Sequence, residues 1–146
     1  MQTSTARRLR RIAAALAVGL ALGAGSLWYR MLSPWGYTPP PDLPQIEAGV
    51  AQRVFAYGTL RNALVRRIVV GRHVRTGQAE LPGYRKQGLD LRAQAEASVE
   101  GEVFVVEADE LRRLDRYERL GVRYERFEGA LGDGSRAWVY RRIERR

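Results

Sequence analysis

The sequence contains no cysteine and only one histidine, His73. Without cysteine, the chain has no disulfide scaffold, no Cys-ligated zinc or iron–sulfur site, no thiol catalysis and no lipoprotein-type cysteine anchor. A single histidine also argues against a Ser-His-Asp triad and against a multi-histidine metal site. Lysine is almost missing as well, because Lys86 is the only one and arginine supplies the remaining positive charge.

The chain is short, with 146 residues, which leaves room for one small domain and an attached segment. Its composition, 45% hydrophobic and 28% charged, excludes wholesale disorder. The net charge of +9 divides into +4 for residues 1–46, with five arginines and one aspartate, and +5 for residues 47–146. The second value describes a mildly basic, mixed surface without the aromatic-interleaved basic stripe of a nucleic-acid-binding protein, so no nucleic-acid partner is expected.

The N-terminus has the pattern of a membrane segment. A basic arm, residues 1–11, precedes a segment from 12 to 32 in which Ile12–Tyr29 carries no charge. As a helix, these 18 residues are about 27 Å long, close to the bilayer core of about 30 Å. The arginines before the segment predict a single-pass anchor with the following domain on the non-cytoplasmic side, periplasmic or extracellular. Two alternatives stay open: a cleaved secretory signal, for which Ala21-Leu22-Gly23 offers a small-x-small site, and a buried soluble helix.

A Pro-rich linker, residues 33–50, is expected to follow, since Pro39, Pro40 and Pro41 favour an extended polyproline path. The domain is placed at residues 51–146. Its pattern predicts an α+β fold, a small mixed or antiparallel β-barrel with flanking short helices. The expected strands are 53–57, 74–86, 98–106, 122–127 and 136–143, the expected helices are 60–68 and 108–120, and residues 86–97 show no pattern beyond being polar.

Two places are candidates for chemistry. In Tyr57-Gly58-Thr59-Leu60-Arg61 a strand ends at a glycine and a helix begins. Glycine permits close approach of a ligand, and free amides at a helix start favour an anionic group such as a carboxylate. The alternative is an ordinary strand-to-helix turn in which Thr59 caps the helix.

The second place is the helix Asp109–Glu118. Leu111, Leu114 and Glu118 share one stripe, so Glu118 lies on the face that enters the core. Burial there raises the pKa of a carboxylate, which can then accept and return a proton near neutral pH. The alternative is that Glu118 forms a buried ion pair with a cation such as Arg126.

Taken in order, the segments VFAYGTLR (54–61), LPGY (81–84), VEGEVF (99–104), LDRYE (114–118) and YER (124–126) resemble the gamma-glutamylcyclotransferase-like superfamily. The resemblance covers residues 53–142. It implies a β-barrel with flanking helices, no metal or cofactor, and conversion of a γ-glutamyl compound into 5-oxoproline and a free amine. It also implies that the glutamyl group binds the turn Tyr57, Gly58, Thr59 and Leu60, that Glu118 is the acid/base, and that Tyr124 and Arg126 lie beside the pocket.

The chain departs from this family at one position of the helix, because Arg119 follows Glu118 where the family usually has glycine. Three functions therefore stay open. The leading one is a membrane-anchored γ-glutamyl cyclotransferase with a small γ-glutamyl compound as its substrate. The others are a non-catalytic ligand-binding or assembly module on the same fold, and a protein that binds membrane surfaces or nucleic acid through arginines.

Overall fold

The computed structural model describes residues 2–31, 33 and 36–144, which form two compact units, Met1–Thr38 and Pro39–Arg146. Parts of three expected regions lie outside the described residues: residue 32 of the membrane segment, residues 34–35 of the linker and residues 145–146 of the domain. The first unit consists mainly of helix α1, Gln2–Met31, so the arginines of the expected basic arm belong to the same helix as the apolar run. Within it, Ala6–Tyr29 is long and apolar enough to span a membrane or to act as a signal sequence.

The second unit contains one mixed sheet of five strands in the order β2-β3-β1-β5-β4. β1 runs antiparallel to β3 and parallel to β5, while β2 and β4 pair antiparallel with β3 and β5. The alternating burial expected of a half-buried strand appears over Arg136–Val139 in β5. The strands are β1 Gln52–Ala56, β2 Thr76–Gln87, β3 Asp90–Val106, β4 Tyr124–Ala130 and β5 Arg136–Arg142. The predicted α+β fold is thus confirmed.

The sheet curls until its two edge strands meet, which gives the barrel-like shape. The amide of Gly132, after β4, donates to the carbonyl of Glu80 in β2 at 2.9 Å. The ring of Tyr84 in β2 lies 5.5 Å from that of Phe127 in β4, measured between centroids. The core between the strands consists of Phe55, Tyr57, Leu81, Leu91, Val99, Leu131, Ala137 and Val139.

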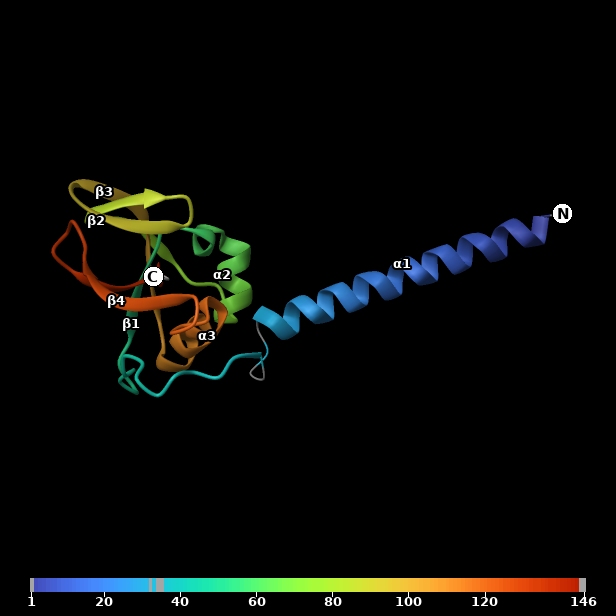
Figure 1. Cartoon of the computed structure of the whole chain (residues 1–146), viewed down its shortest axis with the longest axis horizontal. Coiled ribbons are helices and arrows are strands. Elements are labelled where there is room, and N and C mark those ends of the chain that lie inside the picture. Colours follow the sequence, from blue (N-terminus) through green and yellow to red (C-terminus); the bar gives the residue numbers. More distant parts are fainter. Residues whose placement is uncertain (1, 32, 34–35, 145–146) are drawn as a thin grey trace. The chain divides into compact units, whose positions relative to one another are not determined.

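Two helices accompany the sheet: α2, Ala63–Val70, and α3, Ala108–Glu118 (Figure 1). α2 begins later than the sequence predicts because Asn62, not Thr59, caps it. The Asn62 side chain accepts hydrogen bonds from the amides of Leu64 and Val65, leaving Thr59 in a separate 3-10 turn.

Part of the expected linker packs against the domain. The carbonyl of Pro44 accepts a hydrogen bond from Nη2 of Arg126 at 2.7 Å. A Cβ added to Gly121 would lie 2.6 Å from Cγ of Pro40, so the chain passes closely over the turn after α3. This packing explains why the compact unit already begins at Pro39.

Candidate active site

The first wall of the site is the turn that follows β1. Thr59–Arg61 forms one 3-10 turn, in which the amide of Arg61 donates to the carbonyl of Gly58. The amides of Thr59 and Leu60 open this turn, so they have no partner within it. Such amides can bind a carboxylate or a developing oxyanion.

Arg66 fixes the back of this turn. Its guanidinium donates to the carbonyls of Leu60, at 2.8 Å, and Arg61, at 3.2 Å, and pairs with Glu102 at 2.9 Å. The Arg66 and Glu102 side chains are only 7% and 17% exposed, so the charges are held in a low-dielectric environment where the pair is strong. A charge-assisted network therefore holds the two carbonyls of the turn in place.

Glu118 supplies the second wall. It is the last residue of α3, and it lines a cavity together with Tyr57, Gly58, Thr59, Leu60 and Tyr124. The enclosed part of this cavity is small, about 40 Å³, and with its open mouth the hollow contains about 360 Å³ of empty space. Burial raises the pKa of the Glu118 carboxyl from 4.5 to about 7, and the nearby Arg123 opposes the rise. A group with this pKa exchanges a proton readily near neutral pH.

Two tyrosines that line the cavity are joined by a hydrogen bond. The hydroxyl of Tyr57 donates to the backbone carbonyl of Tyr140 at 2.7 Å, and the hydroxyl of Tyr140 donates to Oδ1 of Asp115 at 2.6 Å. Burial raises the pKa of both hydroxyls, so they stay protonated and act as donors. Burial also raises the pKa of Asp115, against the effect of Arg126, whose Nη1 lies 3.5 Å from Oδ2 of Asp115.

Six of the seven residues singled out from the sequence line this cavity: Tyr57, Gly58, Thr59, Leu60, Glu118 and Tyr124. Arg126 is not among the lining residues. Its fully buried side chain lies 4.5 Å from the ring of Trp138 and reaches Asp115 and Pro44. The ion pair considered from the sequence, Glu118 with Arg126, is thus replaced by Asp115 with Arg126.

Sequence reasoning missed four lining residues: Phe55, Ala56, Leu89 and Tyr140. The first two belong to β1, the strand that leads into the turn, and because Val54, Phe55 and Ala56 are all buried, strand periodicity does not single them out. Leu89 follows Gly88 in the segment that shows no pattern. Its apolar side chain among polar residues is the only signal in the sequence that could have indicated a lining residue. Across the part of the chain that the structure describes, no group of three His, Asp or Glu side chains could hold a metal ion.

The chain belongs to the family described as "Gamma-glutamyl cyclotransferase, AIG2-like", because that family model matches residues 54–145. The solution structure of an Arabidopsis thaliana protein is 26% identical with a TM-score of 0.56, covering 64% of this chain and 70% of that chain. A second Arabidopsis thaliana solution structure is 23% identical with a TM-score of 0.56, covering 68% and 67%. A structure named "Gamma-glutamyl cyclotransferase" has the same fold at 14% identity and a TM-score of 0.53, covering 65% and 68%. No curated protein sequence matches significantly.

Proposed function

We propose that this family member is a γ-glutamyl cyclotransferase in which Glu118 is the acid/base. The observation that carries the proposal is a buried carboxyl, with its pKa raised to about 7, in one cavity with the turn Gly58–Leu60. A carboxyl in that position is matched to proton transfer at neutral pH, and the amides of the turn are matched to an anionic group of the substrate.

The chemistry follows from these two walls. The α-carboxylate of the γ-glutamyl group binds the amides of the turn, which orients the α-amine toward its own γ-carbonyl. Glu118 accepts a proton from the α-ammonium, and the amine nitrogen then bonds to the γ-carbon. Glu118 passes this proton to the leaving nitrogen as the original γ-amide bond breaks. The ring nitrogen loses its second proton to the same carboxylate, which passes it to the released amine, so the products are 5-oxoproline and an ammonium ion. Ring closure is intramolecular, so positioning alone lowers the barrier substantially.

We test this with the full chain in detergent micelles, by measuring the release of 5-oxoproline from γ-glutamyl amino acids, γ-glutamyl amines and glutathione. Glu118→Gln keeps the shape of the side chain but removes the proton acceptor, so release is expected to fall by at least 100-fold. Glu128→Gln is the matched control, since Glu128 is an exposed glutamate of β4 that pairs with Arg136. Its release should equal that of the wild type.

Two results would contradict the proposal. Equal release by the wild type and Glu118→Gln would mean that Glu118 does not transfer the proton. Binding of γ-glutamyl compounds without release by the wild type would favour a non-catalytic ligand-binding module on the same fold.

We further propose that α1 is an uncleaved anchor, with its N-terminal arginines in the cytoplasm and the domain on the other side. The cluster of arginines before the apolar run supports this orientation. Because the chain has no cysteine, a single introduced cysteine can report on the side of the membrane. In right-side-out vesicles an impermeant maleimide should label Ala130→Cys but not Thr5→Cys. Labelling only at Thr5→Cys would reverse the orientation, and loss of the N-terminal residues from the mature protein would favour a cleaved signal.

A further inference from the structure

The hairpin between β2 and β3 places an exposed leucine at the cavity. Leu89 lines the same cavity as Glu118, although 51% of it is exposed. It also faces the substrate-binding turn proposed above, since a Cβ added to Gly58 would lie 3.8 Å from Cδ2 of Leu89. The Leu89 side chain is therefore open to solvent beside the turn, where a ligand bound in the cavity can contact it.

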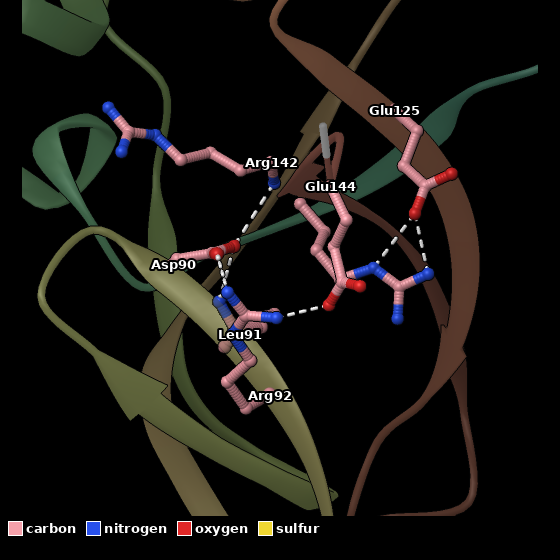
Figure 2. A network of polar contacts seen from close by, with 7 residues as sticks. Asp90, Leu91, Arg92, Glu125, Arg142 and Glu144 are labelled. Carbon is pink, nitrogen blue, oxygen red and sulfur yellow. Dashed lines mark hydrogen bonds and ion pairs between the residues drawn. The ribbon is translucent and has the colours of Figure 1, made fainter. Parts of the chain in front are cut away.

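A polar network joins the tip of this hairpin to the end of β5 (Figure 2). Oδ1 of Asp90 accepts hydrogen bonds from the amide of Leu91, at 2.8 Å, and from the amide of Arg142, at 3.2 Å. Arg92 lies 3.8 Å from Asp90 and forms an ion pair with Glu144. Leu89, immediately before this network, is therefore held in place before any ligand binds, which lowers the entropic cost of binding.

The cavity has a closed end and an open end. Phe55, Ala56, Leu60 and Tyr140, which line its inner part, are each less than 5% exposed. Thr59 and Leu89 are exposed, so they mark the mouth. A γ-glutamyl group bound to the turn and Glu118 fills the inner part, and whatever is attached to its γ-nitrogen must extend toward the mouth and Leu89.

We propose that Leu89 is a specificity-determining residue that contacts the substituent of the leaving amine, and that the preferred donors are γ-glutamyl derivatives of amines with apolar chains. This inference rests on the proposed cyclotransferase function. The contact is apolar, and it is available both before and after the C–N bond breaks. It should therefore increase affinity with each methylene group that reaches Leu89.

The test uses γ-glutamyl methylamide, propylamide and pentylamide with the full chain in detergent micelles. We expect kcat/KM to rise by up to about fourfold for each methylene group that Leu89 covers. Leu89→Ala should flatten this dependence. Val105→Ala is the matched control, because Val105 is 47% exposed on β3 and does not line this cavity, so it should retain the wild-type dependence.

Asp90→Ala provides a second variant that acts on the hairpin without touching the ligand. Loss of the network should weaken the dependence of kcat/KM on the alkyl length of the donor, although Leu89 is still present. Three results would each overturn the inference. They are a wild-type kcat/KM that does not change with the number of methylene groups, a preference for charged leaving amines, and a kcat/KM that rises as steeply in Leu89→Ala as in the wild type.

Binding separates this inference from the proposed function. Calorimetric titration of Glu118→Gln with the same three compounds measures affinity without turnover, and Leu89→Ala in that background should remove the increase per methylene group. If the wild type releases no 5-oxoproline but the binding series still depends on Leu89, the catalytic proposal fails and the leucine contact stands. If release occurs and neither series depends on Leu89, only the leucine contact fails.

Discussion

The raised pKa of Glu118 makes the stability of the domain depend on pH. The folded protein holds the Glu118 proton with a pKa of about 7, whereas an unhindered glutamate has a pKa of 4.5. The folded state therefore binds this proton more tightly than the unfolded chain, and the resulting stabilisation is complete below pH 4.5. It is lost as the pH rises through 7, and the difference amounts to about 3 kcal/mol at most.

Glu118→Gln isolates this contribution because glutamine does not titrate. Unfolding free energies are measured in urea from pH 4 to pH 8 for both proteins, in detergent micelles, with the fluorescence of Trp138 as the domain's signal. Asp115 also has a raised pKa, but it is present in both proteins, so its contribution cancels in the difference. We expect the stability of the wild type relative to Glu118→Gln to fall by about 3 kcal/mol between pH 4.5 and pH 7.5.

A stability difference that does not change across this range would refute the buried, proton-holding environment of Glu118. The same group should govern activity, because only its ionised form accepts a proton from the substrate. We therefore expect kcat/KM of the wild type to rise with pH and to level off above pH 7. A profile that is flat from pH 5 to pH 8 would contradict the role of Glu118 as the base.

Three further substitutions test the scaffold around the site. Arg119 adopts a left-handed conformation, with φ at 53°, so Arg119→Gly should stabilise the domain by about 0.5–1 kcal/mol and raise its thermal midpoint; a lower midpoint would contradict the strain. A Cβ at Gly101 would lie 2.5 Å from the carbonyl oxygen of Ala56, so Gly101→Ala should lower the free energy of unfolding in urea by about 1–3 kcal/mol. At Gly77 the nearest atom is 3.8 Å away, so the control Gly77→Ala should lower it by less than about 1 kcal/mol. Equal losses for the two variants would refute the clash at Gly101. Glu102→Ala leaves the buried Arg66 without its carboxylate partner, so the free energy of unfolding should fall by about 3 kcal/mol and KM should rise. An unchanged KM would mean that the turn does not depend on this ion pair.

The turn after β1 and the face of α3 could be predicted because each depends on local sequence. The β-forming residues end at Tyr57 and a glycine follows, while Glu118 follows Leu111 and Leu114 on one helical stripe. Burial of that stripe then raises the pKa of Glu118, as expected from the position alone. The prediction that Thr59 caps α2 is wrong. Both Thr59 and Asn62 are residue types that cap helices, and only the tertiary structure selects Asn62.

The first half of β3 could not be predicted from its residues. Between Asp90 and Ala97 only Leu91 is buried, so no alternation appears, and the strand forms because it pairs with β2. Leu89 reaches the cavity only through this hairpin. The surroundings of Arg126 were equally hidden, because they include Pro44, from a segment interpreted as a linker, and Asp115, from another element. Such contacts join residues far apart in the sequence, which periodicity does not encode.

The most direct test of the proposed reaction follows the α-nitrogen of the substrate. A γ-glutamyl donor labelled with ¹⁵N at its α-amine is incubated with the full chain, and the products are identified by NMR. Intramolecular attack predicts 5-oxoproline with ¹⁵N in its ring and a released amine without the label. Labelled glutamate in place of 5-oxoproline would show that water attacks the γ-carbonyl, and it would contradict the cyclotransferase function.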